Sequence, residues 1–255
     1  MSNRDYIVFT DLDGSLLNHE DYSFEDAKEM ISFLKEHHIP IIIVTSKTKN
    51  EVVKYQKEMG IDDPFIVENG AAVFYPAKEG YEITQLGVDY KSIKACLERV
   101  KEKYDIKGFS DMNIDEIMAF TGLDLESAKI ASKREFSEPF VIKDERILSK
   151  VEPLVEKCGL KIMKGGRFYH CMSIDQDKGK AVKEVIKRYK KIKPSLKTVA
   201  LGDNYNDIPM LKEVDIPVLI PRYNHKFIEF DKKDLIHAKY PGSKGWSESL
   251  KRILG

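Results

Sequence analysis

The chain has 255 residues, of which 42% are hydrophobic and 33% are charged, so it can form a large core with a smaller insert. Its 42 Lys and Arg residues balance its 42 Asp and Glu residues, which argues against a nucleic acid or a membrane surface as partner. No stretch approaches the roughly 18 apolar residues of a transmembrane helix. Residues 1–10 also lack the order of a signal peptide.

The three cysteines, Cys96, Cys158 and Cys171, are odd in number and far apart, without a Cys-x-x-Cys pair. This spacing argues against a disulfide framework and against a thiolate zinc site. We therefore expect a cytoplasmic protein. Its oligomeric state, monomer or homodimer, is left open.

The predicted elements alternate between strands and helices. The first half of the predicted core has strands over residues 6–10, 39–44, 65–67 and 71–75, with helices from residue 23 and over residues 49–59. The dipeptide Asn69-Gly70 predicts a hairpin before the last of these strands. The continuous β-branched run at 39–44 is typical of a parallel strand buried on both faces.

The middle of the chain differs in character from what precedes it. Here we expect helices over residues 92–104, 125–133 and 147–158, with short strands over 140–143, 161–163 and 168–173. A basic helix over 178–190, strands over 196–201, 218–220 and 235–237, and a helix over 244–253 complete the chain. The pattern predicts an α/β protein: a parallel core of residues 1–83 and 174–255, interrupted by an α+β insert of residues 84–173.

The first candidate site residues are Asp11 and Asp13, which follow the strand over residues 6–10 and precede Gly14. Ligands of open α/β sheets bind beyond the carboxyl ends of the strands. Two carboxylates so close repel one another unless a proton or a cation intervenes, and Mg²⁺ is a hard cation that prefers such oxygens. The alternative is a helix-capping Asp followed by a turn Asp.

Three later segments also place a hydroxyl, an ammonium or a carboxylate group after a predicted strand or at the start of a predicted helix. Ser46 follows a buried strand, where its hydroxyl could donate to a phosphoryl oxygen or simply cap a helix. Lys178 begins a helix, where a cation opposes the helix dipole unless an anion is nearby; a solvated surface lysine is the alternative. Asp203 follows another strand and could bind a metal, with Asn206 and Asp207 holding its partners in place, although a loop with a helix cap would look the same.

Taken together, these four motifs resemble those of the haloacid dehalogenase superfamily of phosphotransferases. The matching segments are Asp-x-Asp-Gly-Ser at 11–15, Ser46, Lys178 and Gly-Asp-x-x-Asn-Asp at 202–207. Ser15 stands where the family more often has Thr. The resemblance implies a Rossmann-like core, with the insert as a C2-type cap.

A narrower resemblance is to the mannosyl-3-phosphoglycerate phosphatase family. It rests on segments 46–48, 68–76, 133–139, 165–170 and 241–246. It implies a phosphorylated sugar-glycerate as substrate and a place in the synthesis of mannosylglycerate, a compatible solute. The residues expected to bind substrate are Lys47, Glu68, Asn69, Arg134, Ser137, Arg167 and His170.

The chemistry of these side chains fits such a substrate. Arg134 and Arg167 could each hold an oxyanion in bidentate geometry. Alternatively, Arg134 pairs with Glu135 or Glu138, and the glycines before Arg167 only form a hairpin turn.

The resemblance also implies a mechanism. Asp11 attacks phosphorus and forms an aspartyl-phosphate, and Asp13 acts as acid and then as base. Asp11, Asp203 and the Asp13 carbonyl bind Mg²⁺, and Ser46 with Lys178 binds the phosphate. Glucosyl-3-phosphoglycerate or another sugar phosphate remains an alternative substrate. A module that binds sugar phosphate without turnover is the alternative outside enzymes.

Overall fold

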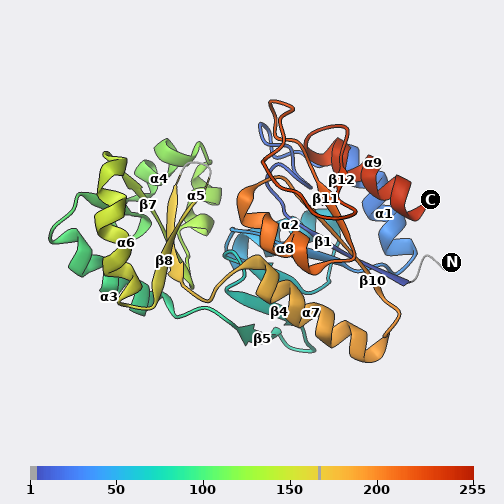
Figure 1. Cartoon of the computed structure of the whole chain (residues 1–255), viewed down its shortest axis with the longest axis horizontal. Coiled ribbons are helices and arrows are strands. Elements are labelled where there is room, and N and C mark those ends of the chain that lie inside the picture. The colour runs from blue at the N-terminus through green and yellow to red at the C-terminus, as the bar shows by residue number, and fades with distance from the viewer. Residues whose placement is uncertain (1–4, 166–167) are drawn as a thin grey trace.

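The computed structural model describes residues 5–165 and 168–255, which form two lobes (Figure 1). The larger lobe is built on an eight-stranded sheet, and the smaller lobe on a four-stranded sheet. The chain enters the smaller lobe after strand β5 (Tyr81–Gln85) and returns after strand β9 (Tyr169–Ser173). Two chain segments therefore connect the lobes.

The large sheet has the strand order β12-β11-β10-β1-β2-β3-β4-β5. Its strands besides β5 are β1 (Tyr6–Thr10), β2 (Ile41–Val44), β3 (Phe65–Val67), β4 (Ala72–Pro76), β10 (Lys197–Gly202), β11 (Ile216–Leu219) and β12 (Ile236–His237). All neighbours pair in parallel except β3 with β4 and β4 with β5. The predicted parallel α/β core is confirmed, and so is the hairpin at Asn69-Gly70.

Helices cover both faces of the large sheet, which explains why its central strands are apolar throughout. One face packs against α1 (Lys28–Glu36), α2 (Lys49–Met59) and α9 (Gly242–Leu254). The other packs against α7 (Lys178–Ile192) and α8 (Ile208–Glu213). Trp246 on α9 is fully buried, and its indole N–H donates to the Thr10 hydroxyl at 2.9 Å. This bond joins α9 to the last residue of β1.

The small sheet is antiparallel, with the order β6-β7-β9-β8. Its other strands are β6 (Ile106–Gly108), β7 (Ser137–Ile142) and β8 (Leu160–Lys164). Helices α3 (Tyr90–Lys101) and α6 (Leu148–Glu156) pack on the face that carries Phe140 and Cys171. Because side chains alternate along a strand, the paired residues Pro139 and His170 lie on the opposite face. Helices α4 (Ile114–Thr121) and α5 (Leu125–Ala131) form a smaller apolar cluster with neighbouring loops.

Three elements between residues 81 and 121 were not predicted: the strands β5 and β6 and the helix α4. Strand β5 is largely exposed at the sheet edge, so its sequence shows no clear apolar alternation. Since β5 pairs with β4, the large sheet extends past the predicted boundary at residue 83. Helix α4 carries a capping box between Asn113 and Glu116, a signal present in the sequence. Short 3₁₀ turns lie at Glu25–Ala27, Phe109–Asp111, Glu145–Ile147 and Tyr205–Asp207.

The expectation of no disulfide is wrong, because Cys96 and Cys158 are joined in one. Cys96 lies on α3, and Cys158 follows α6. These two helices pack on the same face of the small sheet, so cysteines separated by 62 residues in sequence meet in space. Cys171 is free and buried. The bond therefore ties together the two helices of the smaller lobe.

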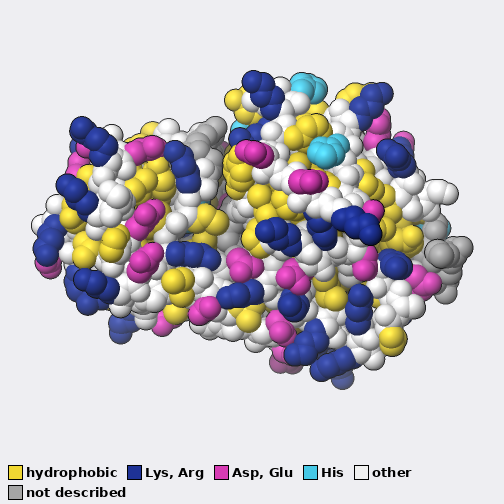
Figure 2. Space-filling model, in the orientation of Figure 1, with side chains coloured by type: hydrophobic (Ala, Val, Ile, Leu, Met, Phe, Trp, Pro, Cys, Tyr) yellow, Lys and Arg dark blue, Asp and Glu magenta, His cyan; other side chains and the backbone are white. Residues whose placement is uncertain are grey.

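The surface carries charges of both signs. On the face shown in Figure 2, basic and acidic side chains are interspersed over both lobes, and the surface is notched between them. Within residues 5–165 and 168–255, no helix combines the length and apolar character needed to cross a bilayer.

Candidate active site

The candidate residues of the larger lobe lie at the carboxyl ends of the central strands of its sheet. Asp11 follows β1, Ser46 follows β2, Glu68 follows β3 and Asp203 follows β10. These strands are parallel, so their carboxyl ends share an edge. Strand β1 lies between β10 and β2, where the strand order reverses, and such points open the crevice in which α/β proteins bind ligands.

A buried cluster of charges lies at this point. Carboxylate oxygens of Asp11, Asp203 and Asp207 come within 4.8 Å of one another. The Lys178 ammonium lies 2.7 Å from an oxygen of Asp11 and 2.7 Å from an oxygen of Asp207. Lys178 is 1% exposed, so it is not a solvated surface lysine. Its helix α7 is capped by Asp177, whose carboxylate accepts from the Lys180 N–H.

Burial and mutual repulsion perturb this cluster. Burial raises the pKa of Asp11 to about 7; Lys178 opposes the rise, and Asp207 and Asp13 add to it. The pKa of Asp203 is also raised, first by burial and then by Asp207 and Asp11. For Lys178, burial alone would lower the pKa, but Asp11 and Asp207 outweigh it and raise the pKa. Three carboxyl groups thus face a single ammonium, and a further cation at this position would favour their ionised forms.

The cluster fits a hard divalent cation. Asp203 Oδ1 is buried without a hydrogen-bond partner among the described residues, so it is available as a ligand. Asp207 is occupied instead: one oxygen pairs with Lys178, and the other accepts from the N–H groups of Asp203 and Asn204 at 3.0 Å each. A Cβ at Gly14 would come within 2.6 Å of the Asp203 carboxylate, so only glycine permits this approach. The donor set is all oxygen, as Mg²⁺ prefers.

Asp13 lies at the margin of this cluster, and its carboxylate is 32% exposed. Its partner is Lys47, whose ammonium lies 3.0 Å away. Lys47 is also 3.9 Å from Glu51 and lies over the ring of Tyr55. Burial would lower the pKa of Lys47, but Asp13 and Glu51 raise it above its usual value. Lys47 thus contacts the predicted acid–base residue directly.

Ser46 lies in the turn between β2 and α2, and it is Thr48, rather than Ser46, that caps the helix. Thr48 and Glu51 form a capping box at the start of α2. The Ser46 carbonyl accepts from Arg134 of the smaller lobe at 3.0 Å. The cap role, which was the alternative for Ser46, therefore belongs to its neighbour.

Arg134 is buried and pairs with a residue that sequence reasoning had not proposed as its partner. Its Nε lies 3.3 Å from the Glu68 carboxylate, and it donates to the Ser137 hydroxyl at 2.6 Å. The predicted alternative partners were Glu135 and Glu138. Within the described residues, Glu135 contributes only its backbone N–H to this group, donated to Glu68.

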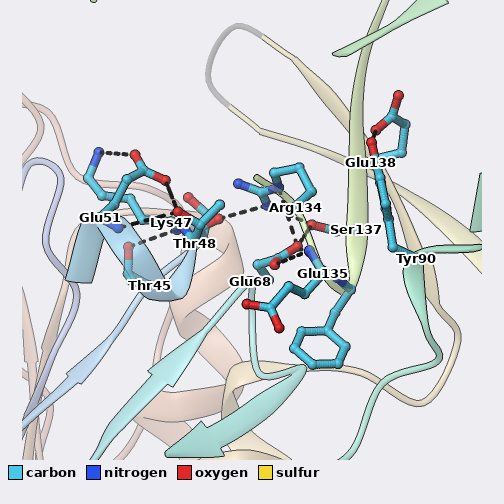
Figure 3. Close-up of polar contacts among 12 residues, drawn as sticks. Thr45, Lys47, Thr48, Glu51, Glu68, Tyr90, Arg134, Glu135, Ser137 and Glu138 are labelled. Atoms are coloured by element: carbon cyan, nitrogen blue, oxygen red, sulfur yellow. Dashed lines mark hydrogen bonds and ion pairs between the residues drawn. The ribbon is translucent and has the colours of Figure 1, made fainter. Parts of the chain in front are cut away.

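Glu138 has different neighbours. Its carboxylate accepts from the Tyr90 hydroxyl and from the Ser110 N–H and hydroxyl. Figure 3 shows Glu138 and Tyr90 apart from the group formed by Arg134, Glu68 and Ser137. Nothing in the sequence between residues 134 and 139 identifies Glu68 as the distant partner.

The remaining predicted site residues are distributed as follows. Asn69 is buried and accepts from the Asn206 side chain at 3.1 Å. The pKa of His170 is lowered to about 3 by burial and by the charge of Arg134, so its imidazole is neutral. Its Nδ1 is buried and unpartnered within the described part of the chain. Arg167 lies outside the described residues.

Sequence reasoning missed one residue of this region, Gln176. It is fully buried, and its side-chain amide donates to the Glu68 carbonyl. It lies two residues before Lys178 and so joins the turn after β3 to the start of α7. An isolated glutamine before a helix carries no recognisable sequence signal.

Comparison with known proteins identifies the family of the chain. A model of the haloacid dehalogenase-like hydrolase family matches residues 8–154 and 142–230. A relative from Persephonella marina, named glucosyl-3-phosphoglycerate/mannosyl-3-phosphoglycerate phosphatase, is 51% identical over 97% of each chain. A mannosyl-3-phosphoglycerate phosphatase from Pyrococcus horikoshii is 33% identical over 86% of this chain and 92% of its own.

Solved structures show the same fold. A sugar phosphatase of haloacid dehalogenase subclass IIB has a TM-score of 0.69 at 20% identity, covering 97% of this chain and 98% of its own. The family predicted from the four motifs is confirmed. The chain therefore belongs to the haloacid dehalogenase-like hydrolases and is one of the phosphatases of that family.

Proposed function

We propose that the chain hydrolyses both mannosyl-3-phosphoglycerate and glucosyl-3-phosphoglycerate, releasing inorganic phosphate, with Mg²⁺ as cofactor. The observation that carries the reaction type is the buried cluster at the end of β1, in which Lys178 holds one oxygen of Asp11 beside Asp203. The names of the relatives from Persephonella marina and Methanococcoides burtonii include both sugars, the latter at 38% identity, which favours a dual substrate over mannosyl alone.

Asp11 is the proposed nucleophile. Lys178 neutralises charge next to it and holds its Oδ1, which leaves Oδ2 to approach phosphorus. A bond forms between this oxygen and phosphorus while the bond from phosphorus to the glycerate oxygen breaks. The product of this step is an aspartyl-phosphate on Asp11.

Asp13 supplies and then removes the proton. As the phosphate ester breaks, its carboxyl group protonates the departing glycerate oxygen. It then takes a proton from the water that attacks phosphorus, and Asp11 is released. Lys47, 3.0 Å away, fixes the position of the Asp13 side chain during both steps.

Two further groups hold the phosphoryl oxygens in this proposal. The Ser46 hydroxyl donates to one oxygen, and the Lys178 ammonium, already at the cluster, faces another. Asp11, Asp203 and the backbone carbonyl of Asp13 would hold Mg²⁺, which neutralises the charge of the phosphate when bound. Asp207 keeps Lys178 and the Asp203 backbone in place.

The smaller lobe is the proposed cap, approximately residues 84–173. Its sheet face with Pro139 and His170 carries a neutral imidazole suited to a sugar hydroxyl, because its Nδ1 has no partner among the described residues. We propose that Arg167, as in the sequence prediction, binds an anionic group of the substrate. A cytoplasmic location stays a prediction.

Phosphate release across a panel of esters tests the proposal. The panel contains mannosyl- and glucosyl-3-phosphoglycerate, 3-phosphoglycerate, mannose phosphates and sucrose phosphate, each with Mg²⁺ or with EDTA. We expect both glycosyl-3-phosphoglycerates to be hydrolysed fastest, only with Mg²⁺, and Asp11→Asn to be inactive. Preference for sucrose phosphate, or binding of these substrates without phosphate release, would contradict the proposed function.

A further inference from the structure

The turn after β3 is held in a conformation that most residues avoid. Glu68, Asn69 and Gly70 have consecutive positive φ angles of 47°, 61° and 92°. For Glu68 such a conformation costs free energy, and it persists only where the surroundings impose it. Here the Glu68 N–H donates to the Lys47 carbonyl at 3.0 Å, and the Asn69 N–H donates to the Thr45 carbonyl at 2.8 Å.

The same turn also contacts the segment that leads into α7. The Gln176 side chain donates to the Glu68 carbonyl. A Cβ at Gly70 would lie 2.1 Å from the Asp177 carbonyl oxygen, so the two backbones are in close contact. The turn is therefore fixed between the Ser46 loop, defined here as residues 45–48, and the residues that immediately precede Lys178.

The Glu68 side chain leaves this turn toward the smaller lobe. It is 1% exposed. Its carboxylate accepts from the N–H groups of Glu135 at 2.9 Å and Phe136 at 3.2 Å, and from the Ser137 hydroxyl at 2.6 Å. Figure 3 shows this carboxylate directed at the start of β7. A carboxylate of the larger lobe is thus satisfied by donors of the smaller one.

Arg134 makes the return contact. Its side chain is 4% exposed and pairs with Glu68 at 3.3 Å. The same guanidinium donates to the Ser46 carbonyl at 3.0 Å. Contacts therefore form a closed circuit, from the Ser46 loop through Arg134 to Glu68, and from Glu68 through its backbone to the Ser46 loop again.

The nucleophile at this site is enclosed. Asp11 is 6% exposed and Lys178 is 1% exposed, and the nearby Ser46 loop is held by Arg134 of the smaller lobe. We infer that a glycosylated phosphoglycerate enters when the two lobes separate. Separation would break the Glu68–Arg134 pair and the bond to the Ser46 carbonyl together. A partial separation that left either the Glu68 carboxylate or the Arg134 guanidinium buried without its partner would be strongly destabilised. The pair therefore favours either a fully closed arrangement or one in which both groups are hydrated.

We propose that Glu68 and Arg134 are positioning residues that couple closure of the cap to the ordering of the Ser46 loop. In the closed enzyme their pair fixes the loop that faces the phosphate, and in the open enzyme that loop is released. The inference rests on the proposed function, because it assigns these residues to the same phosphoryl-transfer site. It replaces the predicted contact of Glu68 and Arg134 with substrate.

The two roles differ in their effect on a minimal substrate. p-Nitrophenyl phosphate has neither a sugar nor a carboxylate, so residues that only bind those groups do not affect its turnover. Residues that order the Ser46 loop affect every phosphate ester. We expect Glu68→Gln and Arg134→Lys each to lower kcat for p-nitrophenyl phosphate by about 10-fold or more, since each weakens a charge-assisted bond.

Lys54→Ala is the matched control. The Lys54 ammonium donates to the Ser127 hydroxyl at 3.3 Å, which joins α2 to α5 of the smaller lobe without contacting the Ser46 loop. Its kcat should remain within about twofold of the wild type, because only a single partly buried polar contact away from the Ser46 loop is lost. The double variant of Glu68 and Arg134 should lose no more than the worse single variant, because both act through one circuit.

Hydrogen exchange of the backbone N–H groups in the Ser46 loop gives a readout that does not depend on activity. In the full-length protein with Mg²⁺, Glu68→Gln should exchange at least about 10-fold faster at residues 45–48 than wild type, and Lys54→Ala should not. Unchanged exchange, or an unchanged kcat for p-nitrophenyl phosphate with loss only for phosphoglycerate substrates, would overturn the coupling. Failure of wild type on every glycosyl-3-phosphoglycerate would instead contradict the proposed function while leaving the exchange result valid.

Discussion

Replacement of Lys178 by Met is the sharpest test of how the acidic cluster is balanced. The ammonium is 1% exposed and makes two contacts of 2.7 Å, with Asp11 and Asp207. Met keeps most of the side-chain volume but leaves three carboxylates within 4.8 Å without a cation. Breaking a buried ion pair by removing one partner costs about 3–5 kcal/mol. We expect the free energy of unfolding to fall by this amount in EDTA.

Mg²⁺ should reverse part of this loss. A cation that binds only the folded state adds stability according to its concentration relative to Kd, about 2.7 kcal/mol at a hundredfold excess. The variant cluster is more negative than the wild-type cluster, so the stability gained on adding Mg²⁺ should be larger in the variant. Activity should remain low, because the phosphoryl oxygens lose a cation, an effect of about 10²–10³-fold in kcat.

The assay is urea unfolding of wild type and Lys178→Met, each in EDTA and in saturating Mg²⁺. Lys54→Ala, a substitution at a partly buried contact away from the cluster, serves as the control for a lost lysine. The reasoning would be refuted if Lys178→Met lost less than about 1 kcal/mol in EDTA, the range of a surface ion pair. It would also be refuted if Mg²⁺ stabilised the variant less than the wild type.

Three further outcomes are expected. Asp203→Asn should raise the Mg²⁺ concentration needed for half-maximal activity by at least about 10-fold, since it removes a charged carboxylate whose Oδ1 is buried and has no partner among the described residues. An unchanged requirement would exclude Asp203 as a ligand. Burial raises the pKa of Asp63 from 3.8 to about 6, so the folded state binds this proton more tightly than the unfolded state and the free energy of unfolding falls as the pH rises from about 4 to 6. In urea titrations across that window, Asp63→Asn should therefore gain up to about 3 kcal/mol of stability relative to wild type. A difference between variant and wild type that stays constant with pH would contradict this. Cys158→Ser should lower the free energy of unfolding by about 4 kcal/mol relative to the oxidised wild type, because the bond closes a loop with a sequence separation of 62 residues. The stability of the variant should match that of the reduced wild type. If the variant and the oxidised wild type were equally stable, the disulfide would not be stabilising.

The arrangement at the sheet edge could be predicted because it follows from parallel pairing. Asp11, Ser46 and Asp203 each follow an apolar strand, and strands of this kind place their carboxyl ends together. A different local signal, a cation at the start of a helix, singled out Lys178, although a solvated surface lysine was the alternative. Local signals of this kind are contained within a few residues of the chain.

Contacts between distant segments could not be predicted in this way. The partner of Arg134 is Glu68, which belongs to the other lobe, whereas the sequence suggested only the nearby Glu135 and Glu138. Cys96 and Cys158 meet because two helices share one face of the small sheet, a packing that their spacing does not encode. Such partners depend on tertiary structure rather than on local pattern.

The central claim is that Asp11 becomes phosphorylated during turnover. It can be tested by quenching the enzyme in acid during steady-state hydrolysis of glucosyl-3-phosphoglycerate with Mg²⁺, then reducing acyl phosphates with borohydride and sequencing the peptides by mass spectrometry. Reduction of an aspartyl-phosphate yields homoserine, and we predict homoserine at position 11 alone. Turnover without modification at position 11, or with modification at Asp13 or Asp203 instead, would contradict the account.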